Sequence, residues 1–196
     1  WPAHAAPSES LVFRQRPKHQ PDVWSLCASR LLRCLAHLQK QTSGAMEVLV
    51  LDDGSDAGNR QALHAGWPEQ DERFRLIEVA PCGTAVSSGP SAIRNEGLRQ
   101  SRGELVAFCD DDDLWIDPEH AARMLQLFTD QPELDLFLGN QRAVHVDGQT
   151  REDWLPGLTT LCARLPALAP ETYAVTPGQL CRNHCLPANA TNRWTV

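Results

Sequence analysis

Four consecutive carboxylates are the feature of this sequence with the clearest chemistry. They follow an apolar run, residues 105–109, and are Asp110, Asp111, Asp112 and Asp113. In an extended chain side chains alternate in direction, so Asp110 and Asp112 are predicted to share one face. Adjacent carboxylates repel one another without a counter-charge, and oxygen ligands suit Mg²⁺ or Mn²⁺. The alternative interpretation is an acidic turn that caps a helix beginning near Pro118.

A second acidic pair ends another apolar run. Residues 47–51 are followed directly by Asp52 and Asp53, and then by a Gly-Ser pair. A carboxylate at a strand end contacts ribose in dinucleotide-binding folds, so one of the two is a candidate acceptor for a nucleobase or ribose. Asp and Gly also form turns readily, and Ser55 or Asp56 suits the cap of a following helix. Both interpretations stay open on these residues alone.

A third candidate region begins at Gly89. It continues a loop rich in glycine, serine and proline and leads into a predicted helix over residues 91–100, with Ser91 as its expected cap. The start of such a helix offers free N–H groups to an anion. Arg94 keeps its charge and has the reach for a pyrophosphate or a base edge. The equal alternative for Arg94 is a structural ion pair with the acidic loops.

The hydrophobic pattern of the sequence predicts the helices and strands that position these residues. Helical periodicity covers residues 23–41, 59–64, 91–100 and 118–128, while strands are predicted at 11–13, 47–51, 74–79, 105–109, 134–138 and 143–146. Strands that alternate with helices predict an α/β fold with a mainly parallel sheet. Ligands of such sheets bind beyond the carboxyl ends of the strands, where both acidic clusters fall.

Composition excludes some classes of function. The chain has 196 residues, 42% hydrophobic and 22% charged, with a formal net charge of −7. That balance argues against a nucleic-acid binder, which needs a basic face. Seven scattered cysteines predict reduced thiols rather than a disulfide framework. No apolar run approaches the roughly 18–20 residues of a membrane span, and no signal peptide is evident. We expect a cytoplasmic location, either free or peripheral at the inner face of the membrane.

Three blocks together resemble glycosyltransferase family 2. They are residues 48–56 (VLVLDDGSD), 89–98 (GPSAIRNEGL) and 103–115 (GELVAFCDDDDLW), in the family's order and at its usual spacing. The resemblance covers about residues 23–140. It implies the GT-A fold, a Rossmann-like three-layer α/β/α arrangement with a mainly parallel central sheet. It also implies a nucleotide-diphosphate sugar donor, such as a UDP- or GDP-sugar, and transfer with inversion.

The resemblance assigns roles to the first two blocks. Asp53 matches the aspartate that binds the nucleotide base, with Asp52 beside it. Arg94 and Asn95 match an Arg-Asn pair that shapes the donor pocket, and Gly89 opens the same block.

The third block matches the DXD motif. Asp110 and Asp111 are expected at the donor, and Asp110 and Asp112 are expected to hold the metal cofactor, Mn²⁺ or Mg²⁺. The metal would stabilise the negative charge that develops on the departing diphosphate.

Two regions depart from the family pattern. The first strand is short and is followed by a basic segment, residues 14–20. The family's catalytic base comes from an acidic pair that leads a helix downstream of the DXD motif. Only Glu152 and Asp153 offer a later pair, and residues 155–157 (Leu-Pro-Gly) predict no helix after them. The catalytic base is therefore unknown, with this pair as a candidate and an exposed acidic loop as the alternative.

Three segments are expected: an irregular stretch with a short strand at 1–22, a nucleotide-sugar-binding core at 23–150 and a partial acceptor-side region at 151–196. The predicted function is transfer of a sugar to a saccharide, lipid or protein acceptor. One alternative is a nucleotide-sugar-binding module without catalysis, which the missing base favours. Another is a nucleotidyltransferase-like enzyme, although the Gly-rich basic loop typical of that class is not evident.

Overall fold

The structure is a computed structural model that describes residues 9–15, 24–80, 88–145, 147–169, 172–182 and 191–193. The chain divides into two compact units, Trp1–Phe137 with Thr191–Val196, and Leu138–Ala190. In the part of the chain that is described, no helix is both long and apolar enough to cross a membrane.

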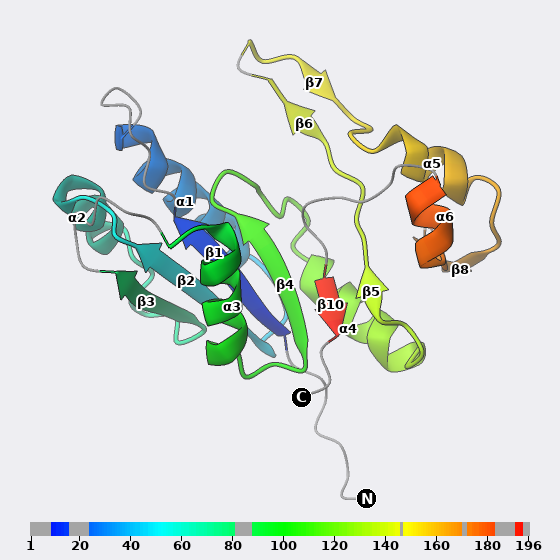
Figure 1. The fold of residues 1–196 in the computed structure, drawn as a ribbon, viewed down its shortest axis with the longest axis horizontal. Coiled ribbons are helices and arrows are strands. Elements are labelled where there is room, and N and C mark those ends of the chain that lie inside the picture. Colours follow the sequence, from blue (N-terminus) through cyan, green and yellow to red (C-terminus); the bar gives the residue numbers. More distant parts are fainter. Residues whose placement is uncertain are drawn as a thin grey trace, which may run out of the picture. The chain divides into compact units, whose positions relative to one another are not determined.

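The first unit contains a six-stranded sheet with helices on both faces (Figure 1). Its elements are β1 (Glu9–Gln15), α1 (Trp24–Gln39), β2 (Met46–Asp53), α2 (Ala57–Ala65), β3 (Phe74–Ala80), α3 (Pro90–Gln100), β4 (Leu105–Asp110), α4 (His120–Asp130), β5 (Leu136–Phe137) and β10 (Thr191–Arg193). The strand order is β3-β2-β1-β4-β10-β5. Strands β1 to β4 are parallel to one another, whereas β10 is antiparallel to both β4 and β5. The α/β fold with a mainly parallel sheet is therefore confirmed.

Two hydrophobic clusters divide the helices between the faces of this sheet. One joins α1, α2 and α4 to alternate residues of the strands, and its fully buried members include Leu31, Leu35, Leu38, Val48, Val50, Leu63 and Ala121. The other joins α3 to the intervening strand residues, with Leu49, Leu51, Ile93 and Val106 buried. Successive strand residues point to opposite faces, so β2 is buried on both sides. That explains why its sequence is a nearly continuous apolar run.

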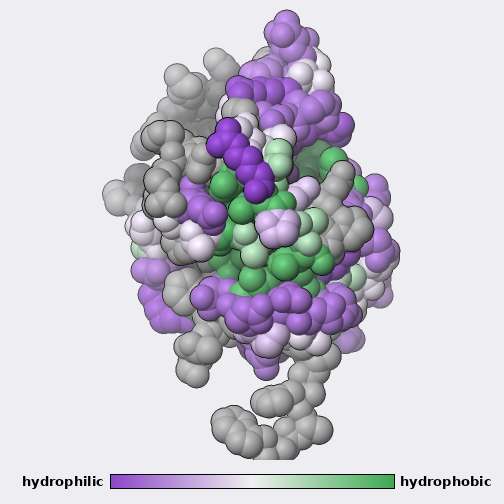
Figure 2. Space-filling view, turned by 90° about the vertical axis from the view of Figure 1, so that its right-hand side faces the viewer, coloured by the Kyte–Doolittle hydropathy of each residue, from purple (hydrophilic) through white to green (hydrophobic). Residues whose placement is uncertain are grey.

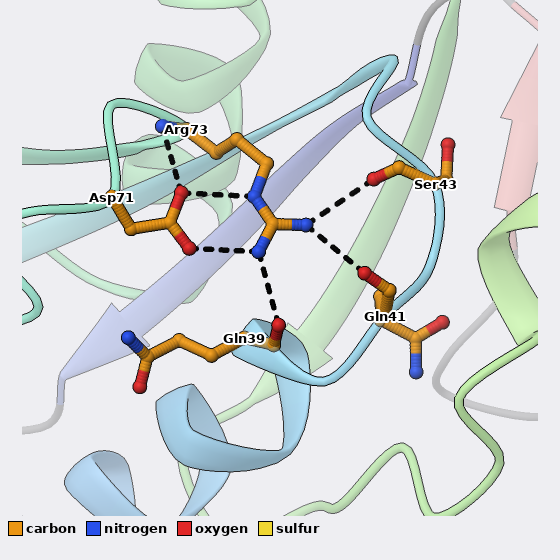
Figure 3. Close-up of polar contacts among 5 residues, drawn as sticks. All are labelled: Gln39, Gln41, Ser43, Asp71 and Arg73. Atoms are coloured by element: carbon orange, nitrogen blue, oxygen red, sulfur yellow. Dashed lines mark hydrogen bonds and ion pairs between the residues drawn. The ribbon is translucent and has the colours of Figure 1, made fainter.

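The side chain of Arg73 links the amino end of β3 to the end of α1 through hydrogen bonds (Figure 3). Its guanidinium donates to both carboxylate oxygens of Asp71, at 2.9 and 2.7 Å. It also donates to the carbonyl oxygens of Gln39, Gln41 and Ser43, at 3.1 to 3.2 Å. The last carbonyls of a helix lack partners within the helix and carry partial negative charge, so a cation there is favourable. One side chain thus holds the connection between α1 and β2.

The second unit is built from short elements. They are β6 (Ala143–Val144), β7 (Thr150–Arg151), α5 (Pro156–Cys162), β8 (Ala167–Ala169), β9 (Thr172–Tyr173) and α6 (Pro177–Arg182). The strands form two antiparallel pairs, β6 with β7 and β8 with β9. A small cluster centred on the buried Leu158 and Leu180 packs α5 against α6.

Several expected elements differ from those observed. The strand expected at residues 143–146 is half of a hairpin in the second unit and not part of the main sheet. The helix expected near Pro118 begins at His120, after a turn. No prediction anticipated β10, whose three residues insert between β4 and β5. Short strands depend on their partners rather than on their own pattern, so the sequence signal for β10 is weak.

Hydrophobic residues also reach the surface. Figure 2 shows one face, on which hydrophobic residues are exposed to solvent. The large apolar side chains that are exposed among the described residues are Ile116, Val144, Trp154 and Leu168.

Candidate functional site

The two acidic clusters lie at the same edge of the sheet. Strands β2 and β4 run parallel to β1, which lies between them, so their carboxyl ends meet on one side. On β1, Gln15 pairs with Asp52 and the preceding residue, Arg14, pairs with Asp110. Two strand spacings of about 4.8 Å each separate the backbones of Asp52 and Asp110 by about 10 Å. The sheet thus brings together residues that are far apart in the sequence.

Asp52 and Asp53 face opposite sides of the sheet. Asp52 continues the row of Val48 and Val50 toward α1 and α2, and Asp53 continues the row of Leu49 and Leu51 toward α3. The hydrogen bonds agree with this alternation. Asp52 contacts a residue of α2, whereas Asp53 accepts from a backbone N–H just before α3.

Asp52 is fully buried, and its carboxylate accepts hydrogen bonds from neighbouring groups of the protein. One oxygen accepts from the Ser55 N–H at 2.8 Å, and the other accepts from Arg60 Nε and Nη2 at 3.2 and 3.0 Å. Arg60 also pairs with Glu78 of β3 at 3.3 Å. A buried charge is tolerated when it is paired and hydrogen-bonded. Sequence reasoning missed Arg60, because its spacing from Asp52 matches no short-range pattern.

The turn after β2 uses the residues that the sequence suggested. Gly54 has a φ of 87°, a conformation that glycine adopts without steric cost. Asp56 caps α2, since its carboxylate accepts from the Asn59 N–H at 3.0 Å. Of the two expected caps, Ser55 or Asp56, the second is the one observed.

Asp53 is also fully buried, and it reaches the start of α3. Its Oδ1 accepts from the Ser88 N–H at 3.2 Å. Gly89 follows at the N-cap with a φ of 87°, and Pro90 is the first helical residue. Ser91 was expected to cap this helix, but no side chain does so. Pro at the first position accounts for the difference, because its fixed φ starts the helix one residue earlier.

Arg94 forms an ion pair with the end of β4. Its Nη2 lies 3.2 Å from Asp110 Oδ1, with side chains 32% and 20% exposed. Asp110 is in the same row as Val106, on the sheet face that α3 covers. The ion pair proposed for Arg94 is therefore present, and the neighbouring Asn95 is exposed.

The remaining aspartates form a turn. The expectation that Asp110 and Asp112 share the face of an extended strand is wrong, because β4 ends at Asp110 and the Asp113 N–H donates to the Asp110 carbonyl at 3.0 Å. Asp111 is buried and Asp112 is exposed. The alternative of a helix cap is also wrong: α4 begins at His120, and no side chain caps it.

The aspartates at and after the end of β4 would provide only some of the ligands that a divalent metal ion needs. Among the described residues, no three His, Cys, Asp or Glu side chains are grouped to hold a metal. Mg²⁺ and Mn²⁺ are commonly held by one or two carboxylates together with substrate phosphates and water. A metal ion held by Asp110, at the end of β4, and by Asp112, in the turn that follows, would therefore need substrate oxygens as further ligands.

Residues Glu152 and Asp153 belong to the second unit, where the structure corrects one expectation. A helix was not expected after them, yet α5 begins at Pro156, a favourable first helical residue. Asp153 Oδ1 accepts from Asn140 Nδ2 at 2.5 Å and from Thr159 Oγ1 at 2.9 Å. Glu152 is 72% exposed and lies 3.8 Å from an Arg142 nitrogen.

Residues 16–23 and residues 81–87, the latter expected to form a loop, lie outside the described residues. The basic end of the first strand, which the sequence marked as a departure from the family, falls mostly in the first of these.

The mainly parallel sheet with helices on both faces is the fold of GT-A glycosyltransferases, which are among the solved structures that it resembles. The mannosyltransferase PcManGT of Pyrobaculum calidifontis, in complex with GDP-Man and Mn²⁺, has a TM-score of 0.54 and 20% identity over 67% of this chain and 35% of that one. S. aureus TarS 1–349 in complex with UDP-GlcNAc has a TM-score of 0.53 and 23% identity over 74% of this chain and 37% of that one.

The chain belongs to glycosyl transferase family 2, whose model matches residues 26–164. EpsH of Bacillus subtilis (strain 168) is 34% identical over 120 residues, which are 61% of this chain and 32% of that protein. The match thus covers about a third of that relative's length.

Proposed function

We propose that this chain carries the donor-binding part of a glycosyltransferase that uses a nucleotide-diphosphate sugar and a divalent metal ion. The observation that carries the proposal is the placement of Asp53, Asp110 and the start of α3 on one sheet face, at the edge where such sheets bind ligands. The donors of the solved neighbours, GDP-Man and UDP-GlcNAc, support a UDP- or GDP-sugar.

Each residue has a proposed task. Asp53 accepts a hydrogen bond from the base or ribose, and Asp52 shapes the turn that presents it. Gly89 and the backbone N–H groups at the start of α3 meet the diphosphate, with Arg94 beside them.

The acidic turn is assigned to the metal. Asp110 and Asp112 hold Mn²⁺ or Mg²⁺, and Asp111, which is buried, supports the turn between them. When bound, the ion supplies Lewis-acid stabilisation of the departing diphosphate.

Transfer with inversion exchanges one bond at the anomeric carbon. The bond to the diphosphate oxygen breaks and its electron pair leaves with the diphosphate, while the acceptor hydroxyl oxygen forms the new bond. The hydroxyl proton passes to a carboxylate base. Of the two candidates, Glu152 is the better one, because Asp153 already accepts two hydrogen bonds from neighbouring side chains.

Calorimetry with UDP- and GDP-sugars, with and without Mn²⁺, tests the proposal. We expect metal-dependent heat with one class of nucleotide. An absence of such heat with every nucleotide overturns it. Asp112→Asn is expected to weaken nucleotide binding in Mn²⁺ but not in its absence, and unchanged affinity contradicts the ligand assignment.

A nucleotide-sugar-binding module without catalysis is the second candidate. The network around Asp153 favours it, since that carboxylate holds Asn140 and Thr159 in place. Comparing transfer by Glu152→Gln and Asp153→Asn separates the two: loss of transfer with intact donor binding in Glu152→Gln alone supports a base. Donor binding without any transfer in the unaltered protein supports the module.

A further inference from the structure

The ion pair between Arg94 and Asp110 places a permanent cation on a carboxylate that we assign to the metal. Arg94 comes from the second turn of α3, and its Nη2 lies 3.2 Å from Asp110 Oδ1. A guanidinium remains protonated at any pH at which the protein is folded. The two side chains are only partly exposed, so water screens the pair less than it screens a pair on the open surface.

In the absence of nucleotide, a divalent ion would approach a carboxylate, Asp110, that is already paired with the Arg94 guanidinium. It would share Asp110 with Arg94, and the two positive charges repel one another at this distance. The described residues supply no third metal-ligating side chain in the same group. The described side chains by themselves therefore offer a divalent ion a poor site.

A nucleotide diphosphate changes this balance. Its oxygens add ligands and negative charge for the metal, and they also offer the guanidinium a new acceptor, since arginine binds phosphate in a two-pronged geometry. Arg94 can then release Asp110 without losing a partner.

We propose that Arg94 is a placeholder cation that positions Asp110 when no metal is bound, disfavours binding of a free divalent ion and makes metal binding conditional on the nucleotide. This inference rests on the proposed function. Arg94 is then a positioning residue for Asp110. Metal and nucleotide are expected to bind together rather than separately.

The test measures Mn²⁺ binding by electron paramagnetic resonance of the free ion, with and without UDP and GDP. We expect Arg94→Met to raise Mn²⁺ affinity about two- to fivefold in the absence of nucleotide, as loss of a partly exposed ion pair allows. With the nucleotide that the unaltered protein binds, the same variant is expected to bind Mn²⁺ less tightly than the unaltered protein. Arg94→Lys keeps the charge and is expected to show no increase without nucleotide.

Arg99 provides the matched control on the same helix. It is 65% exposed and pairs with Glu96 rather than with Asp110. Arg99→Met removes the same charge from α3 and is expected to leave both Mn²⁺ affinities unchanged. An equal rise in both methionine variants would mean a general charge effect and would overturn the placeholder role.

The outcomes separate this inference from the proposed function. If the unaltered protein binds neither UDP nor GDP in Mn²⁺, the proposed function fails. If it binds one of them while Arg94→Met shows unchanged or weaker Mn²⁺ binding without nucleotide, only the placeholder role fails. Circular dichroism checks the fold of each variant, and Arg94→Gln is judged by the same criteria should Arg94→Met not fold.

Discussion

Asp52 and Asp53 are neighbours in the chain, yet their carboxylates lie on opposite faces of the sheet. Asp52 points toward α2 and is paired with Arg60, whereas Asp53 points toward α3 and accepts from the N–H of Ser88. The alternation of strand side chains therefore divides one acidic pair into a residue that holds the turn and a residue on the face of the proposed donor site.

Substitution of the two aspartates is expected to separate stability from binding. Asp52→Asn removes the buried carboxylate that pairs with Arg60 and leaves the half-exposed Glu78 as its acidic neighbour, so we expect a loss of about 2 kcal/mol in the free energy of unfolding. Asp53→Asn removes a charged acceptor on the α3 face, and we expect about a tenfold loss of nucleotide affinity. Urea unfolding and calorimetry measure the two effects. A larger loss of affinity in a still stable Asp52→Asn protein than in Asp53→Asn contradicts the division.

Arg73 is expected to contribute strongly to stability. Arg73→Met removes donors to Asp71, to the last carbonyl oxygen of α1 and to two carbonyl oxygens in the connection that follows, so we expect a loss of about 2–3 kcal/mol in urea unfolding. Arg73→Lys should recover only part of this loss, because an ammonium cannot reproduce the fork of donors. Full recovery in the lysine variant would show that charge alone, rather than the hydrogen-bond geometry, is responsible.

The pairing of Arg73 with Asp71 is expected to make the free energy of unfolding depend on pH in the acid range. Hydrogen bonds from Arg73 lower the pKa of Asp71 below its ordinary value. The stabilisation is therefore complete at neutral pH and is lost as the pH falls through the ordinary carboxyl range to the lowered pKa of the folded state. The difference in unfolding free energy between the unaltered protein and Arg73→Met should shrink over that range. A constant difference down to the acid limit contradicts this linkage.

His120 is expected to make stability fall in mild acid. Its ring packs against Trp115 and Phe137, with centroids 4.5 and 5.8 Å away, and burial lowers its pKa below 6.5. Between that lowered pKa and 6.5 the unfolded chain binds the proton and the folded chain does not, so stability decreases as the pH falls through this window. His120→Phe should show a shallower pH dependence, measured by urea unfolding at a series of pH values. An unchanged slope in this variant argues against a neutral, buried imidazole.

Cys34 and Cys109 are expected to resist alkylation in the folded protein. Their sulfur atoms lie 3.9 Å apart in the core, and the hydrogen bond with Cys34, together with burial, raises the pKa of Cys109 well above its ordinary value. The thiolate is the reactive form, so Cys109 should react with iodoacetamide only after unfolding. Peptide mass spectrometry can compare it with the less buried Cys162. Alkylation of Cys109 at the rate of Cys162 in the native state contradicts the expectation.

Local patterns in the sequence were sufficient for most of the first unit. The apolar runs before Asp52 and Asp110 predict buried strands, because a strand covered on both faces has no polar side. The alternation with helical segments predicts the parallel sheet, and the parallel sheet predicts that both acidic clusters meet at one edge. These inferences depend only on residue type and spacing, which the sequence contains.

Tertiary structure decided the rest. The insertion of β10 beside β4, the pairing of Arg60 with Asp52 and the choice of Asp110 as the partner of Arg94 join residues from different elements. The sequence by itself predicted that two acidic clusters lie at strand ends, and it indicated the family of the chain. Only the packing of α2 and α3 on opposite faces decided that Asp52 holds the turn while Asp53 and Asp110 share one side, because a side chain's partner depends on which helix covers its face of the sheet.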